Sequence, residues 1–354
     1  MTERDLVVHG EAELPDVHVD AYNARLRSGR GFVGDHASKS AFFAIVNGWR
    51  ERVGRAGVDP FGSVPSARLG GRKLEKMMGS KDLVAAAIVH AAVDEYGRAL
   101  AGVIARFLRQ DSWRATERIV IGGGFRASRL GELAIGRAEI ALRSAGKAIE
   151  LRPIRNDPNE AGLLGAAMLV PSVMLGLCDT VIAVDVGGSH FRVGLVELAF
   201  DKPDRLRRSR VAHLDIWRHA DDRPSRRQAV DGLIHMLRRA VRRARKDKLK
   251  LAPIVAIGCP GTIRPDGSIA QGSQNLPGNW ESRRFNLPDS IRAAIPQIGG
   301  RRTIVTMHND AVAQGLSELS NVRDVRRWGV LTIGTGLGNA RLTNHAAPDP
   351  VRNR

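Results

Sequence analysis

Two glycine-rich turns are the parts of this sequence best suited to binding a phosphate. The first, Asp185-Val-Gly187-Gly188-Ser189, lies between two apolar stretches that predict a β-hairpin. The second, Gly334-Thr335-Gly336-Leu-Gly338, follows a predicted strand. Glycine leaves backbone N–H groups uncovered, and clustered N–H groups can bind a phosphate. Both turns are therefore candidate phosphate sites, although glycines that merely close a tight hairpin give the same pattern.

A third glycine run and one carboxylate follow further predicted strands. Gly122-Gly123-Gly124 ends the apolar stretch that starts at residue 118, where flat adenine can lie against bare backbone or where the glycines only form a turn. Asp310 follows the predicted strand 303–308 and precedes a predicted helix over 311–319. A carboxylate at the rim of a sheet can accept the proton of a substrate hydroxyl. The same position suits a helix N-cap, for which Asn309 is the other candidate.

Predicted strands and helices alternate around these motifs, which indicates an α/β protein. Residues 1–75 give no clear pattern. The helices are expected at about 81–110, 130–145, 160–170 and 233–248, and the strands at 118–124, 149–155, 181–186, 191–196, 254–259, 303–308 and 328–333.

Length and composition favour two domains in a reducing compartment. The chain has 354 residues, of which 43% are hydrophobic, enough for two cores of ordinary size. Cys178 and Cys259 are too few for a disulfide scaffold. Residues 1–20 lack the basic and apolar pattern of an export signal. The uncharged stretch 161–178 is broken by Pro171 and is interpreted as a buried helix and a linker. We therefore expect a cytoplasmic protein with no membrane partner.

The net charge of +18 raises the question of a nucleic-acid partner. Part of the excess lies at Arg205, Arg207, Arg208 and Arg210, and part in the run 238–248. Apolar residues recur at helical spacing through this run, so its basic residues occupy the other face of one amphipathic helix. Aromatic residues make up only 5% of the chain and do not alternate with the basic ones. We expect a solvated basic face and no specific nucleic-acid partner, with attraction of nucleotides or polyphosphate as the alternative.

Six segments together resemble the ROK group of sugar kinases and repressors, within the actin-like/hexokinase ATPase superfamily. They are Asp185 to Ser189 (first phosphate motif), Gly334 to Gly338 (second phosphate motif), Ile121 to Gly124 (adenosine motif), Cys259 to Gly261 with Asn275 to Trp280 (sugar-site stretch), Asn309 to Ala311 (catalytic segment) and Asp157 to Ala167 (closing helix).

This resemblance implies the two-domain actin-like ATPase (ribonuclease H-like) fold with a cleft between the domains. It also implies a phosphotransferase with an alcohol group as acceptor, a glucokinase-like kinase of a hexose or N-acetylhexosamine. Asp310 would be the catalytic base, taking the hydroxyl proton as the sugar attacks the γ-phosphoryl group of ATP. Asp185 would orient Mg²⁺ or its waters. Nucleotide would be bound by Gly187, Gly188, Ser189, Gly334, Thr335, Gly336, Gly338, Gly122, Gly123 and Gly124, and sugar by Gly261, Asn275, Asn309, Asp310 and Glu11.

The order of these segments differs from the usual one. The usual order would start near residue 179, run to 345 and continue with residues 1–170, so the chain resembles a circular permutant. The old ends would be joined through 171–178, and the new ends would lie in the turn after the second phosphate motif. The expected domains are a large α/β domain in two parts, 1–157 and 307–354, and a continuous small domain, 158–306.

Two departures from the family concern the sugar site. The family's zinc loop, Cys-x-Cys-Gly-x-x-Gly-Cys, is absent, so we expect no structural zinc. The Glu-x-Gly-His element has only a faint counterpart at residues 10–14, in which Glu11 matches the glutamate and Leu14 stands in place of the histidine. His9 and His18 are the candidates to replace it.

Two other functions stay open. The same group contains sugar-responsive transcriptional regulators, which carry an added helix-turn-helix that residues 1–75 do not display. A non-catalytic protein that binds sugar or nucleotide is the other alternative. The sequence also leaves open polyphosphate as donor, assembly as a homodimer and the identity of the sugar.

Overall fold

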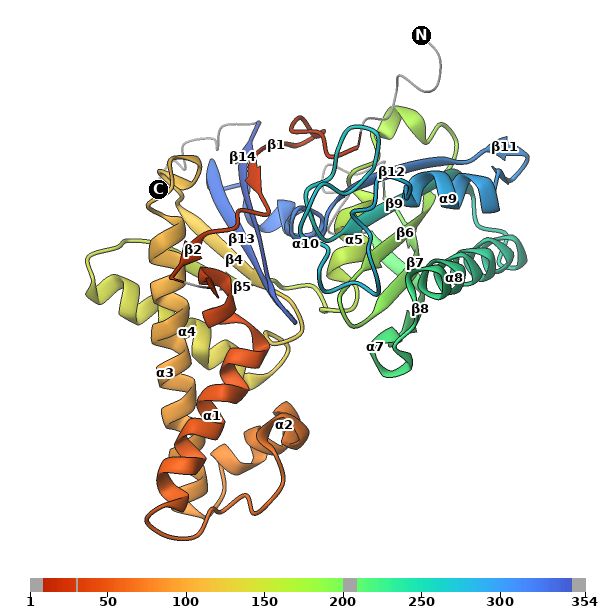
Figure 1. Ribbon diagram of the computed structural model, residues 1–354. Helices are drawn as coiled ribbons and strands as arrows, with labels where there is room; N and C mark the ends of the chain where they lie inside the picture. The colour runs from red at the N-terminus through yellow and green to blue at the C-terminus, as the bar shows by residue number, and fades with distance from the viewer. Residues whose placement is uncertain (1–8, 30, 200–208, 346–354) are drawn as a thin grey trace. The chain divides into compact units, whose positions relative to one another are not determined.

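The computed structural model describes residues 9–29, 31–199 and 209–345 (Figure 1). Two compact units make up the chain. The first comprises 1–23, 155–326 and 339–354, and the second comprises 24–154 and 327–338. Arg205, Arg207 and Arg208 lie outside the described residues, as does most of the region expected to hold the new ends of a permutant. The domain boundaries expected from the resemblance stay a prediction.

A five-stranded sheet forms the centre of the first unit, in the order β12-β9-β6-β7-β8. Its strands are β6 (Thr180–Val186), β7 (Phe191–Glu197), β8 (Arg210–Trp217), β9 (Leu251–Cys259) and β12 (Ile304–Asn309). The first three form an antiparallel meander, and β9 lies between β6 and β12 and pairs parallel with both. The carboxyl ends of these three parallel strands therefore meet at one edge, where α/β proteins usually bind ligands.

Helices cover both faces of this sheet (Figure 1). The helix α5 (Ala161–Ala167) packs with α10 (Asp310–Leu316) on one face, while α8 (Arg226–Lys246) and α9 (Leu287–Ala294) pack on the other. The apolar side of α8 lies against the core of the sheet, as its amphipathic pattern predicts. Short elements complete the unit: α7 (His219–Asp222), β10 (Gln297–Ile298), β11 (Arg301–Arg302), and the 3₁₀ turns Ser172–Met174 and Leu319–Asn321.

The second unit places parallel strands against a group of helices. Its strands β13 (Arg327–Ile333), β4 (Arg118–Gly122) and β5 (Glu150–Pro153) pair in that order. A large apolar core joins α1 (Lys39–Gly54), α2 (Ser66–Met78), α3 (Leu83–Phe107) and α4 (Arg129–Ser144) to these strands. Short elements are β2 (Arg27–Ser28), β3 (Gly31–Phe32), and the 3₁₀ turns Val33–Ala37 and Asp111–Trp113.

The two five-stranded sheets have the same order of neighbours. In the first sheet, β6, β7, β8, β9 and β12 are the first to fifth strands along the chain. From one edge of the sheet to the other, they lie in the order third, second, first, fourth and fifth. The second sheet, β1-β14-β13-β4-β5, includes β1 (Val17–Tyr22) and β14 (Leu337–Asn344). It shows the same order only when β13 and β14 are counted before β1.

The helices and strands predicted after residue 80 are confirmed with shifts at their ends, the largest at α8, which begins at Arg226 and not at 233. Asn309, not Asp310, is the N-cap of α10, since its side chain accepts the N–H of Ala311. The prediction missed β1, α1 and α2 in the first 80 residues, and β8, α9 and β14 after them. On α1 the buried face includes Arg50, whose guanidinium pairs with Asp59, so a charge interrupts the apolar pattern. Helix α2 is broken by Gly70, which has a φ of 70°.

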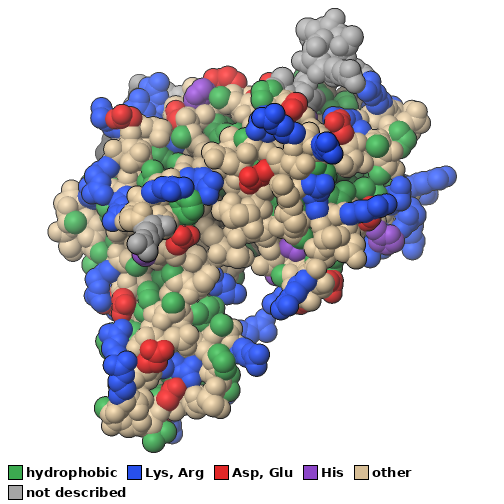
Figure 2. Space-filling view, in the orientation of Figure 1, with side chains coloured by type: hydrophobic (Ala, Val, Ile, Leu, Met, Phe, Trp, Pro, Cys, Tyr) green, Lys and Arg blue, Asp and Glu red, His purple; other side chains and the backbone are tan. Residues whose placement is uncertain are grey.

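The apolar helices and the surface charges of the described residues both bear on the expected partners. None of their helices is both long enough and apolar enough to cross a bilayer. On the face that Figure 2 shows, Lys and Arg side chains occur at many separate places, with Asp and Glu among them. This distribution differs from a single basic stripe.

The close packing of α5 against α10 generates a stability prediction. A Cβ atom at Gly165 would overlap the carbonyl oxygen of Ala313, whereas a Cβ at the exposed Gly136 of α4 would meet nothing. Gly165→Ala is expected to lower the free energy of unfolding by about 2 kcal/mol or more, because α5 must move away from α10. Gly136→Ala should raise it by roughly 0.5–1 kcal/mol, since alanine favours the helix. Urea unfolding of both variants measures the difference, and equal effects would contradict the packing.

Candidate functional site

Asp185 lies at the carboxyl end of β6, buried and paired with an arginine. Its Oδ2 accepts a hydrogen bond of 2.9 Å from Nη1 of Arg192, which stands opposite it on β7. Arg192 Nε also donates to Asn159 Oδ1 at 3.1 Å. Burial raises the pKa of Asp185, and the charge and hydrogen bond of Arg192 oppose that rise. The sequence analysis did not single out Arg192, although the hairpin register places it opposite Asp185.

The glycine turn after Asp185 is held in place by its own backbone and by α7. Gly187 N–H donates to His190 O at 2.9 Å, and the buried His219 donates from Nε2 to Gly187 O at 2.9 Å. A Cβ at Gly187 would lie 3.0 Å from His190 O, so the tight turn favours glycine there. The backbone of Gly188 and Ser189 forms the tip of this turn.

Asp310 is the first residue of α10 and follows β12 directly. It is half-buried. Withdrawal from water is the main cause, and the negative charge of Asp185 the second, of a rise in the pKa of Asp310 to about 7. A carboxyl group with this pKa can exchange protons near neutral pH, as a general base must.

Asp185 and Asp310 stand on either side of β9. Gly258 of β9 pairs with Asp185, and a Cβ at Gly258 would lie 3.6 Å from the Cα of Asp310. Burial, Asp310 and Asp185 together raise the pKa of the buried Cys259 thiol well above its usual value. The two carboxyl groups and the thiol therefore share one poorly hydrated region at the carboxyl ends of β6, β9 and β12.

A chain of hydrogen bonds joins three of the segments predicted to bind sugar. The side chain of Asn309 donates from Nδ2 to Gly261 O at 2.9 Å. The buried His308 accepts the Asn309 N–H at Nδ1, at 2.7 Å, and its Nε2 donates to Glu11 O at 2.9 Å. Burial lowers the pKa of His308 to about 4, so the ring is neutral near pH 7 with its proton on Nε2. His308 thus connects Glu11 to Asn309, the residue before Asp310.

The segment after Glu11 also holds the loop that contains Gly261. Gly261 has a φ of 106°, a conformation that favours glycine. Tyr22 donates from its hydroxyl to Ile263 O at 3.2 Å, and Asn23 donates from Nδ2 to Thr262 Oγ1 at 2.9 Å. Residues from the first 23 positions therefore help to build this side of the candidate site.

The two histidines proposed to replace the missing family histidine have partners and neighbours other than Glu11. His9 is buried beside Gly267, and burial and then Arg292 lower the pKa of His9 to about 4. His18 is bound to Glu13, with Nδ1 2.6 Å from Oε1. The histidine next to Glu11 is His308, which sequence reasoning missed although it directly precedes Asn309. The side chains of Glu11 and Asn275 are exposed.

The second unit brings together the other two glycine motifs. The turn Gly334 to Gly338 follows β13, and Gly334 O accepts the N–H of Lys39 at the start of α1. Gly123 has a φ of 86°, and a Cβ there would overlap the carbonyl of Ile333. The adenosine-motif glycines therefore pack against the end of β13, beside the second phosphate motif.

The donor set of these turns fits a phosphate better than a tightly bound metal. Within the part of the chain that the structure describes, no three His, Cys, Asp or Glu side chains cluster as metal ligands. Asp185 already pairs with Arg192. The glycine turns present backbone where side chains would crowd a ligand, which suits the oxygens of a phosphate.

The model of one protein family matches part of the chain. Residues 181–348 match the model of the ROK family, which confirms the resemblance there. No curated protein matches the chain. Solved structures that match include a candidate N-acetylmannosamine kinase from Listeria monocytogenes, with 23% identity, a TM-score of 0.33 and coverage of 47% of each chain. Another is a candidate sugar kinase from Cytophaga hutchinsonii, with 18% identity, a TM-score of 0.32 and coverage of 47% of this chain and 48% of that one. The chain thus spans about half the length of these structures.

The raised pKa of Asp310 generates a prediction about stability and pH. Because the pKa of Asp310 is about 7 in the folded protein and near its ordinary 3.8 in the unfolded chain, the ionisation of Asp310 lowers the stability of the protein as pH rises from about 4 to 7. Asp310→Asn removes the ionisable group. The melting temperature of the variant should therefore exceed that of the parent at pH 8 and differ little from it at pH 4. Thermal unfolding of both proteins at the two pH values measures this. A gain of the same size at both would contradict the assigned pKa.

Proposed function

We propose that this chain, in which residues 181–348 match the ROK family, is an ATP-dependent sugar kinase. It would transfer the γ-phosphoryl group to a hydroxyl of a hexose or N-acetylhexosamine. The observation that carries this proposal is the placement of Asp310. This carboxyl group, with a pKa of about 7, lies at the carboxyl end of β12, across β9 from the glycine turn of Asp185.

Asp310 acts as the general base in this proposal. Its ionised carboxylate accepts the proton of the sugar hydroxyl while the hydroxyl oxygen attacks the phosphorus atom. A pKa near the working pH keeps a useful fraction ionised while leaving the group basic enough to take the proton. Phosphoryl transfer depends mainly on positioning and charge stabilisation, which fits a site of glycine turns and one carboxylate.

The nucleotide phosphates would be bound by backbone N–H groups of the two glycine hairpins, with adenosine near Gly122 to Gly124. Mg²⁺, when bound with ATP, neutralises charge on the phosphate oxygens. Asp185 would help to orient the waters around this ion. Its pairing with Arg192 supports this indirect role, because the arginine already occupies one carboxylate oxygen.

The sugar would lie beside Asn309, Gly261, Glu11 and Asn275. Asn309 uses one lone pair of Oδ1 for Ala311 N–H and one hydrogen of Nδ2 for Gly261 O. An amide oxygen has two lone pairs and an amide nitrogen two hydrogens, so one of each remains and the same side chain can also bind a sugar hydroxyl. Glu11 has an exposed side chain whose backbone is held by His308, which supports its role as a sugar ligand.

The order of elements supports a circular permutation. When β13 and β14 are counted before β1, and the two-residue strands are left aside, the chain passes through each sheet in a similar way: three strands, two or three helices, a strand, a helix, a strand and a helix. The family match also begins at β6, the strand with which the usual order starts. We propose on this basis that the chain is a circular permutant whose order in the family would start near β6.

A coupled assay of ADP release tests the proposed activity. Wild-type protein is offered glucose, mannose, fructose, N-acetylglucosamine and N-acetylmannosamine with Mg-ATP, and the screen is repeated with polyphosphate and direct product detection. Asp310→Asn should lower the rate by roughly 10²–10⁴, because general-base help is lost, while nucleotide binding and the fold persist.

Asp289→Asn is the matched control, since Asp289 is an exposed aspartate in the first turn of α9. It should keep full activity. Near-normal turnover in Asp310→Asn would refute the role of Asp310. Wild-type protein that consumes no donor with any of these sugars would refute the kinase assignment over that panel.

Two substitutions at His308 separate its two hydrogen bonds. His308→Gln places a donor near the position of Nε2 and can keep the bond to Glu11, whereas His308→Asn places an acceptor near Nδ1 and can keep the bond to Asn309. If Glu11 binds the sugar, His308→Asn should raise the sugar KM several-fold more than His308→Gln does, with the ATP KM unchanged.

Steady-state kinetics of both variants, with melting temperatures as the folding control, measure this difference. Equal sugar KM values in the two variants would contradict a role of the Glu11 contact in sugar binding.

A further inference from the structure

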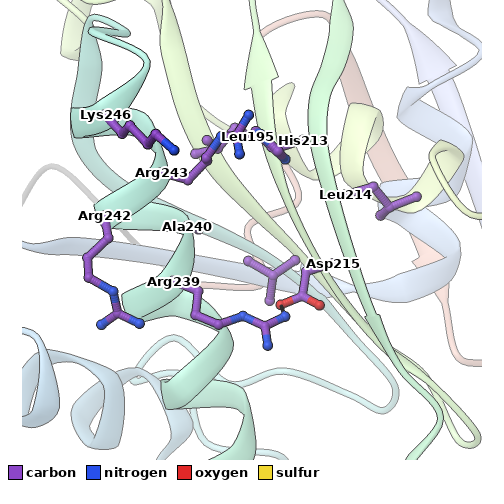
Figure 3. A pocket seen from close by; sticks show the side chains of 10 residues that line it. Leu195, His213, Leu214, Asp215, Arg239, Ala240, Arg242, Arg243 and Lys246 are labelled. Atoms are coloured by element: carbon purple, nitrogen blue, oxygen red, sulfur yellow. Dashed lines mark hydrogen bonds and ion pairs between the residues drawn. The ribbon is translucent and has the colours of Figure 1, made fainter.

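A basic pocket lies between the β7–β8 hairpin and α8 (Figure 3). Its volume is about 400 Å³, within the usual range for small-ligand sites. Figure 3 shows Arg239, Arg243 and Lys246 reaching from α8 toward the strands, where His213 and Asp215 face them. The basic face of α8, which the sequence analysis interpreted as solvated, therefore partly lines a hollow.

The floor of this pocket is apolar and its walls are mixed. Val193 and Leu195 of β7 are buried at its base, and Ala240 lies on the helix side. The aliphatic stems of the arginine and lysine side chains add apolar surface above this floor, while their charged ends stay at the rim. A ligand with an apolar or flat aromatic body can pack here, since guanidinium groups stack on aromatic faces.

The charges around the pocket do not cancel within the described residues. Arg239 pairs with Asp215, and Arg243 Nε donates to Asp247 Oδ2 at 2.6 Å. Oδ2 of Asp247 also lies 3.5 Å from Nε2 of His213. The hydrogen bond from Arg243 is the main reason why the pKa of Asp247 is lowered. The pocket is lined by four Arg and Lys side chains, Arg239, Arg242, Arg243 and Lys246, against the two carboxylates of Asp215 and Asp247. An excess of two positive charges remains.

We propose that this pocket binds a small phosphomonoester whose organic part is apolar or aromatic. A phosphomonoester carries a charge of about −1.5 to −2 at pH 7, which matches the excess. Its oxygens can accept charge-assisted hydrogen bonds from Arg243 and Lys246. Its organic part can cover Val193, Leu195 and Ala240. Inorganic phosphate would fill little of the pocket, and an extended polyanion would contact the rim and leave the floor uncovered.

This pocket is distinct from the carboxylate pair of the proposed active site. It lies on the α8 face of the sheet, whereas Asp310 begins α10 on the opposite face. The strand β7 connects the two regions, because it starts after the Asp185 turn and carries Val193 and Leu195 into the floor. The proposal therefore stands whether or not the chain is a sugar kinase.

Isothermal titration calorimetry with 1-naphthyl phosphate tests the proposal on the full chain. The double variant Arg243→Gln with Lys246→Gln should weaken binding at least about tenfold, because two charge-assisted hydrogen bonds are lost. The matched control is Arg245→Gln with Lys248→Gln, which removes the same charge from exposed residues outside the lining. It should change the affinity less than about twofold, which is a difference below 0.5 kcal/mol.

A third variant and three further ligands complete the test. Ala240→Phe fills the pocket without changing its charge and should also abolish binding. In the parent protein, 1-naphthol and inorganic phosphate should each bind far more weakly than 1-naphthyl phosphate. Heparin, the third ligand, serves as an extended polyanion. The proposal would be overturned if the control variant weakened binding equally, or if 1-naphthol bound as tightly as 1-naphthyl phosphate. It would also be overturned if only heparin bound, or if 1-naphthyl phosphate did not bind at millimolar concentration. Melting temperatures confirm that each variant is folded.

Discussion

The withdrawal of Asp185 and Asp310 from water is the constraint on which the candidate site depends. Two carboxyl groups at adjacent strand ends repel each other when both are ionised, and burial adds to that cost. The two carboxyl groups differ in what stabilises their negative charge. Asp185 pairs with Arg192, whereas Asp310 is stabilised by backbone N–H groups. Burial and the charge of Asp185 both raise the pKa of Asp310, whereas at Asp185 the charge and hydrogen bond of Arg192 oppose the rise that burial causes.

Small residues make this withdrawal from water possible. A Cβ at Gly162 would lie 2.8 Å from Asp185 Cγ, so only glycine lets α5 approach the carboxyl group so closely. Gly258 does the same beneath the start of α10, where a Cβ would lie 3.0 Å from the Cβ of Ala313. The apolar, small-residue composition of α5 thus serves the electrostatics of the site as well as its packing.

The sequence predicted the motifs better than the contacts between them. Asp185, Asp310 and the glycine turns could be recognised because each follows an apolar strand, and strand ends can be read from local patterns. Arg192 and His308 were missed because their roles depend on partners: Arg192 faces Asp185 across a hairpin, and His308 contacts Glu11 from 297 positions away. Helix α1 was missed because Arg50 lies in its buried face, satisfied by Asp59 and by backbone carbonyls.

The position of Glu11 follows from strand pairing more than from its own sequence. The strand β1, which begins six residues later, pairs antiparallel with β14 from Val17↔Asn344 to Tyr22↔Ala340. Residues 10 and 11, shortly before this strand, lie next to β12, where Gly10 N–H donates to Met307 O and His308 Nε2 donates to Glu11 O. Hydrogen bonds between strands depend on which strands are neighbours and not on the order in which the chain visits them. A sheet can therefore keep its geometry when its first two strands come last, and the sugar-site glutamate proposed here is held by that geometry.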